Sequence, residues 1–100
     1  MKRPRLHIVI CNRIGAAMDD WRGCLDVVRF DRMSGVDRNG REIRFVSASE
    51  GNVAGMSPST FSINRPDVRL SIREREAIHE SRNALLRRGS QELDDLEARK

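Results

Sequence analysis

The segment LHIVICNRIGAAMDDWRG, residues 6–23, carries the strongest structural signal in this chain. Its first six residues are almost all apolar and rich in β-branched side chains, which is typical of a buried strand. In the remainder, apolar residues recur at the spacing of one helix face: Ile14, Ala17, Met18 and Trp21. We therefore expect a strand followed directly by a helix, with Asn12 as its N-cap and Gly23 as its stop.

Three later segments have strand patterns: residues 25–30, 41–48 and 60–64. Asn39-Gly40 is a turn signal because both residues tolerate positive φ, so the first two of these strands are expected to form a hairpin across a loop at 34–40. A strand, a crossover helix and another strand predict a parallel pair, to which the hairpin adds an antiparallel member. One helical turn is expected at 52–56.

The last third of the chain is predicted to be one long charged helix. Ser71 and Glu74 match a capping box, which places the helix start, and the pattern runs to about Arg88. Gly89-Ser90 interrupts it, and residues 90–100 are expected to be a charged tail or a weaker, fraying helix.

These patterns together predict the fold class. At 100 residues the chain has the size of one domain, expected over residues 1–89. We predict a small α/β sandwich with the order strand, helix, strand, strand, turn, strand, helix, a mixed sheet and a long C-terminal helix.

The charge composition permits nucleic-acid binding, but the excess of positive charge is spread along the chain. The formal net charge is +4, and apart from Lys2 and Lys100 every basic residue is an arginine. Arg3, Arg5 and Arg13 are the candidate phosphate contacts in a nucleic-acid-binding alternative. No apolar run is long enough for a membrane helix and no signal peptide is present, so we expect a cytoplasmic protein without a membrane partner.

Residues with reactive groups form no recognisable catalytic pattern. Cys11 and Cys24 lack metal-ligand spacing, and His7 and His79 have no nucleophile or metal partner nearby in sequence. The loop at 12–17 follows a strand and opens a helix, as anion sites do, yet it lacks a phosphate-binding glycine motif. A nuclease interpretation would use Asp31 with the segment 42–44. We predict no enzyme activity, no cofactor and no metal.

One family resemblance concerns residues 39–64, about a quarter of the chain. The segment NGREIRFVSA at 39–48, followed by GMSPSTFSI at 55–63, resembles part of the P-loop ATPase core of phage terminase large subunits and related helicases. The acidic pair of that family is replaced by Asn64-Arg65, and no Walker A motif is present. The resemblance therefore implies a P-loop-like scaffold without ATPase chemistry, and no catalytic residue carries over.

The helix at 71–88 gives the main prediction of function. Its apolar stripe is narrow, which favours a helix that is only partly covered by its own domain. The expected partner-binding residues are Arg75, Ile78, Arg82, Leu85 and Leu86. We predict a non-enzymatic accessory protein that docks on a protein partner as an inhibitor or modulator. The resemblance suggests a phage or mobile-element origin, and then the host cytoplasm.

Three other functions stay open at the level of sequence. The same helix favours a homodimer if a second copy covers it. The dispersed arginines favour a nucleic-acid-binding module, which would bind more weakly as salt rises. The loop at 12–15 favours a degenerate nucleotide-binding domain or enzyme, which ATP or GTP with magnesium would stabilise.

Overall fold

The computed structural model describes residues 5–12, 14–22, 27–31, 34–37, 40–49, 53, 55–64 and 70–94. In chain order its elements are β1 (Leu6–Cys11), α1 (Ile14–Arg22), β2 (Val27–Asp31), β3 (Ser34–Asp37), β4 (Glu42–Ser47), β5 (Thr60–Ile63), α3 (Ile72–Arg87) and β6 (Gln91–Glu92). The strands of the described part form one mixed sheet in the order β2-β3-β4-β1-β5-β6. The predicted α/β class, the mixed sheet and the long last helix are confirmed.

Strand β1 lies inside the sheet and has parallel neighbours on both sides. It pairs with β4 from Leu6 opposite Glu42 to Cys11 opposite Ser47. On its other edge it pairs with β5 from His7 opposite Thr60 onward. Residues 7–11 of β1 are all buried. This position explains its nearly continuous apolar sequence, because a parallel strand that is covered on both faces has no solvent side.

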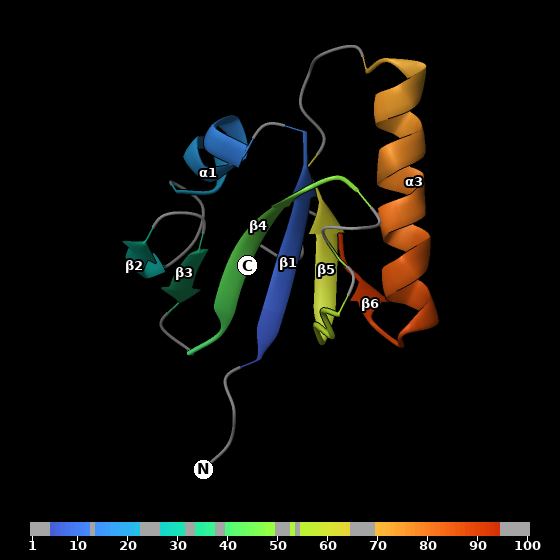
Figure 1. Ribbon diagram of the computed structural model, residues 1–100. Helices are drawn as coiled ribbons and strands as arrows, with labels where there is room; N and C mark the ends of the chain where they lie inside the picture. The colour runs from blue at the N-terminus through green and yellow to red at the C-terminus, as the bar shows by residue number, and fades with distance from the viewer. Residues whose placement is uncertain are drawn as a thin grey trace.

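Helices cover both faces of the sheet, so the molecule has three layers (Figure 1). Successive strand residues point to opposite faces. One face carries a core cluster that joins strand residues to Ala17 and Trp21 of α1: Val9, Cys11, Ile43 and Phe45. The other face carries a cluster that joins Ala84 and Leu85 of α3 to Val53 and strand residues: Ile8, Ile10, Val46 and Phe61.

Helix α3 has the start and the stop that its sequence predicts. The Ser71 Oγ accepts a hydrogen bond from the Glu74 N–H at 3.1 Å, and the Ser71 N–H donates to the Glu74 carboxylate at 3.0 Å. At the other end Gly89 has a φ of +86°. The Ser90 N–H donates to the Leu85 carbonyl and the Gly89 N–H to the Leu86 carbonyl, both at 3.1 Å, which is a Schellman stop.

The pairing of the central strands differs from the sequence prediction. Residues 34–37, expected to be loop, form β3, which is antiparallel to both β2 and β4. The expected direct hairpin between residues 25–30 and 41–48 is therefore wrong, because β3 lies between them. Gly40, with a φ of +79°, belongs instead to the turn from β3 into β4. The expected parallel pair of the first two strands is also absent, since β1, the most apolar strand, is enclosed by β4 and β5.

The chain beyond α3 returns to the sheet and does not continue as a helix. Gln91–Glu92 form β6, which is parallel to β5. The Leu93 N–H donates to the Phe61 carbonyl at 2.8 Å, so the edge of β5 offers this segment hydrogen bonds that a frayed tail would lack. Residues 95–100 lie outside the described part. Of the turn expected at 52–56, Val53 is helical and buried in the core.

Candidate functional site

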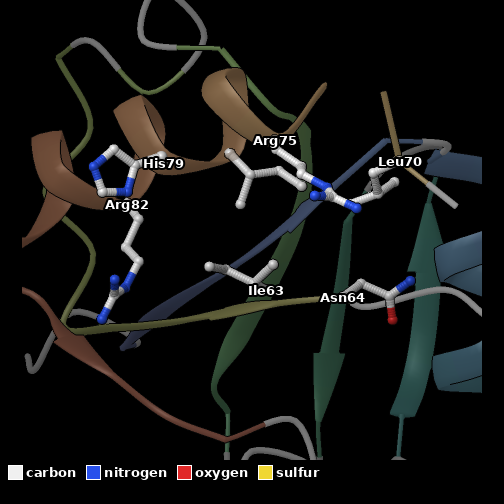
Figure 2. Close-up of a pocket in the computed structure, with 7 residues that line it drawn as sticks. Ile63, Asn64, Leu70, Arg75, His79 and Arg82 are labelled. Carbon is white, nitrogen blue, oxygen red and sulfur yellow. The ribbon is translucent and has the colours of Figure 1, made fainter. Parts of the chain in front are cut away.

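Helix α3 packs on the sheet mainly through its second half. Ser81, Ala84 and Leu85 are buried, whereas residues 72–80 are all exposed or half-buried. Between the first half of α3 and the end of β5 lies a pocket of about 400 Å³. We call it the α3 pocket, and it is lined by Ile63, Asn64, Leu70, Arg75, Ile78, His79 and Arg82 (Figure 2). Its volume is within the range of small-ligand sites.

The apolar part of the α3 pocket comes from three separate segments. Ile63 ends β5, Leu70 precedes the helix and Ile78 lies on the helix itself, and all three side chains are half-buried. Asn64 is buried beside them, and its Oδ1 accepts a hydrogen bond from the Trp21 Nε1–H at 3.2 Å. Because Trp21 belongs to α1, this bond ties the wall of the pocket to the opposite layer of the molecule.

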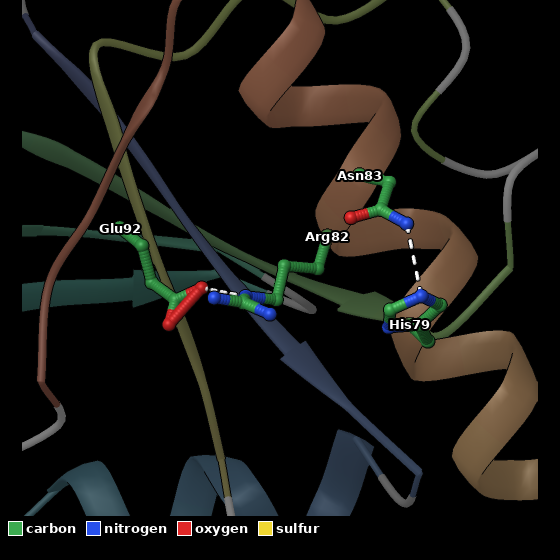
Figure 3. Close-up of polar contacts among 4 residues, drawn as sticks. All are labelled: His79, Arg82, Asn83 and Glu92. Carbon is green, nitrogen blue, oxygen red and sulfur yellow. Dashed lines mark hydrogen bonds and ion pairs between the residues drawn. The ribbon is translucent and has the colours of Figure 1, made fainter.

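The basic side chains of the α3 pocket differ in what they contact. Arg82 forms an ion pair with Glu92 of β6, which anchors the helix to the edge strand (Figure 3). The Asn83 Nδ2 lies 3.1 Å from the His79 Nε2, a hydrogen bond between side chains one turn apart on the helix. Arg75 is exposed, and within the described part its guanidinium makes no hydrogen bond or ion pair.

A second hollow, of about 470 Å³, adjoins the α3 pocket on the outer side of the helix. It is lined by Ile72, Arg75, Glu76, His79 and Glu80, so Arg75 and His79 border both spaces. Ile72 is 76% exposed, the largest exposed fraction among the large apolar residues of the described part. The first half of α3 therefore offers apolar surface, positive charge and hollowed shape together.

The α3 pocket lies at a characteristic place in the topology. Strands β1 and β5 are parallel neighbours, and the chain leaves them toward helices on opposite faces of the sheet. In open α/β sheets, ligands bind outside the carboxyl ends of strands at such a point. Ile63 and Asn64 form the carboxyl end of β5, so the pocket occupies this position.

The structure brings together only part of the predicted partner-binding set. Arg75, Ile78 and Arg82 all line the α3 pocket. Leu85 is fully buried in the core beneath the helix, which removes it from any binding surface. Leu86 is 40% exposed but lies near the far end of α3, outside the pocket. Sequence reasoning missed Ile63, Asn64, Leu70 and His79, although the end of a predicted strand was a signal for the first two.

The predicted phosphate contacts do not form a described patch. Arg3 and Arg13 lie outside the described residues. Arg5 is exposed just before β1, at the amino end of the parallel strands and thus at the opposite end of the sheet from the α3 pocket. Arg88 donates from Nη1 to the carbonyls of Val53 and Met56, at 2.7 and 2.8 Å, which is a structural role.

The other chemical hypotheses gain little from the described residues. In the loop at 12–17, the Asn12 Nδ2 is buried without a hydrogen-bond partner in the described part, and an anion site there stays a prediction. Gly15 is not closely packed, since a Cβ would meet nothing within 4 Å. Glu42 of the nuclease hypothesis pairs with Arg44 at 2.9 Å. Across the described ranges, no group of three His, Cys, Asp or Glu side chains is placed to hold a metal.

Two titratable side chains, those of His7 and Cys11, are buried in the core. His7 contacts the Thr60 Oγ1 at 2.7 Å and the Ser62 Oγ at 3.0 Å, and its ring lies 5.9 Å from that of Trp21. Burial, with the Arg41 charge as the smaller cause, lowers the pKa of His7 to about 4. Burial also raises the pKa of Cys11 to about 11. At neutral pH both groups are therefore uncharged, and the Cys11 thiol is a poor nucleophile.

The chain matches no protein-family model, no curated protein and no solved structure in our comparisons. Within the described residues, no helix has both the length and the apolar character needed to cross a membrane.

Proposed function

We propose that this chain is a non-enzymatic binding protein that docks on a protein partner through the first half of α3. The observation that carries the proposal is the incomplete packing of this helix. Its second half is used for the core, while its first half borders the α3 pocket and exposes Ile72 to solvent. Exposed apolar side chains around a concave surface are typical of protein interaction sites.

The composition of the surface supports binding rather than a reaction. Arginine guanidinium groups stay charged at any physiological pH, so Arg75 and Arg82 bind anions and do not exchange protons. The aliphatic side chains around them supply area that a partner can cover. Such a protein would act by occupying a surface of its partner, as an inhibitor or modulator does.

Dispersed arginine contacts to nucleic acid are supported less well. A nucleic-acid surface needs several unengaged cations on one face. On α3 the Arg82 and Arg88 side chains already have partners, and Glu76 and Glu80 lie beside Arg75 in the outer hollow. The negative side chains would repel a phosphate backbone that ran along this helix.

A nucleotide-binding function is the second candidate, favoured by the position of the α3 pocket at the carboxyl end of β5. The measurement is the thermal unfolding midpoint with ATP or GTP and magnesium, because a ligand that binds the folded state raises it. An increase with nucleotide, lost on Arg75→Glu, would move this candidate to the front.

The test of docking is affinity capture of the tagged chain from nuclease-treated lysate of the cells that make it, with washes at low and high salt. We compare the wild type with Ile72→Asp and with Leu86→Asp, the same kind of change at the other end of α3. We expect a stoichiometric protein that the wild type and Leu86→Asp retain at high salt and Ile72→Asp loses.

Three outcomes would contradict the proposal. Recovery of nucleic acid alone, without nuclease and at low salt, would favour the arginine-phosphate alternative. A partner lost with Leu86→Asp but retained with Ile72→Asp would place docking elsewhere. A dimer mass in light scattering, abolished by Ile72→Asp, would identify a second copy of the chain as the occupant.

A further inference from the structure

We propose that the partner segment that docks at α3 presents a carboxylate next to a branched aliphatic or aromatic side chain. The carboxylate pairs with Arg75, and its apolar neighbour fills the α3 pocket against Ile63, Leu70 and Ile78. This inference rests on the proposed docking function and specifies the chemistry of the partner.

The charge of the α3 pocket selects a negative group. Among the residues that the structure describes, its lining holds two arginines, Arg75 and Arg82, beside His79, and no acidic side chain. The carboxylate of Glu92 lies close by but already pairs with the Nε of Arg82. Within the described part, Arg75 has no such counter-ion. A planar guanidinium binds a carboxylate through two parallel hydrogen bonds, which fixes the direction of the incoming group.

The apolar lining of the α3 pocket favours a partner that carries an apolar side chain next to the negative group. Figure 2 shows Arg75 extending from α3 toward Leu70, with Ile63 on the strand below. An isolated small anion at Arg75 would leave these half-buried aliphatic side chains in water. A segment that also carries an apolar side chain would cover them and would gain the hydrophobic contribution of that contact.

The outer hollow favours a protein carboxylate over a phosphate chain. Glu76 and Glu80 lie on the far side of Arg75 and His79. A nucleic acid brings a regular row of negative charges, part of which would pass these glutamates. A single Asp or Glu in an apolar segment can reach Arg75 from the sheet side and avoid them.

The experiment is selection of short random peptides displayed on phage against the full chain, followed by sequencing of the enriched pool. We repeat it with Arg75→Glu and with Arg73→Glu. Arg73 is the matched control, because it is exposed on the same helix, lines neither hollow and gives the same change in net charge. All three proteins must first show equal thermal midpoints.

We expect the wild type and Arg73→Glu to enrich peptides in which Asp or Glu adjoins an aliphatic or aromatic residue. Arg75→Glu should lose them. In a synthetic peptide of the enriched sequence, replacing the acid by its amide should weaken binding about tenfold or more, as loss of a charged hydrogen bond does. Replacing the apolar neighbour by serine should weaken it as well.

Peptides without an acidic residue, or peptides that bind Arg75→Glu and Arg73→Glu equally, would overturn the inference. They would leave the docking function standing if Ile72→Asp still abolished capture of the partner. Displacement of the peptide by inorganic phosphate as readily as by its own unlabelled copy would reveal a simple anion site and would also overturn it. Failure to enrich any peptide would count against both proposals.

Discussion

The surroundings of His7 differ strongly from those of an imidazole in water. His7 lies fully buried in β1, where both ring nitrogens contact hydroxyl groups of β5. Its burial follows from its place in an apolar strand that is covered on both faces. Thr60 and Ser62 lie more than fifty positions away, and no local pattern links them to His7, so the hydrogen bonds themselves were not predictable.

The buried imidazole makes stability depend on pH. The pKa of His7 falls from an ordinary value of 6.5 to about 4, so between these values the unfolded chain binds a proton that the folded chain refuses. Above pH 6.5 the titration of His7 should therefore not affect the free energy of unfolding. As the pH falls from 6.5 to 4, this group should lower that free energy by about 3 kcal/mol.

The measurement is urea unfolding of the wild type and His7→Gln at several pH values from 7 to 4. The variant removes this titration and keeps the other groups, so the difference between the two curves isolates His7. A difference that stays constant over the whole pH range would show that His7 is not buried as an uncharged base.

For helix α3, the two ends could be predicted from the sequence, but the buried face could not. Its capping box and its glycine stop were predictable, because both are local chemistry between residues close in sequence. Its exposed and buried faces were not, because burial depends on where β5 and β6 lie. Leu85 and Leu86 are adjacent and chemically identical, yet one is in the core and the other is exposed.

Arg88 should stabilise the connection between α3 and the segment that contains Val53. Its guanidinium donates to two carbonyls, those of Val53 and Met56, and few other bonds hold this segment in the described structure. We expect Arg88→Gln to lower the free energy of unfolding by about 1–3 kcal/mol. Urea unfolding measures it.

The matched control is Arg73→Gln, which removes the same charge from an exposed position of α3. It should change stability by no more than about 0.5 kcal/mol. Equal effects of the two substitutions would mean that Arg88 contributes only charge and that the loop is held by other contacts.

At the scale of the whole molecule, the class of the fold was predictable and the strand order was not. Periodicity fixes which segments are strands and helices when they are long, as in β1 and α3. It missed β3, whose sequence SGVD has no strand alternation and which is a strand because β2 and β4 pair with it from both sides. Order depends on contacts between distant segments, which local patterns do not encode.

The edge strand β6, although only two residues long, should contribute to stability and prevent self-association. It covers the outer edge of β5, and Ser90 before it donates to the Pro58 carbonyl at 2.7 Å. A chain that ends at Gly89 leaves this edge open, and open edges associate. We expect it to have a lower urea midpoint and to self-associate as concentration rises.

A chain that ends at Asp94 is the comparison, because the two shortened chains differ only in residues 90–94. Unfolding curves and light scattering at several concentrations would measure the difference. Equal midpoints and equal masses for both would show that the returning segment contributes nothing to stability.

The central place of β1 has a consequence for synthesis on the ribosome. This strand is made before its two neighbours, β4 and β5, which begin only at Glu42 and Thr60. Closing such distant pairs is slow, and the waiting chain exposes an apolar, β-prone segment. During synthesis, the segment LHIVIC therefore has no native strand to pair with until its neighbours are made. A chaperone that binds the segment in this interval would raise the yield of folded protein.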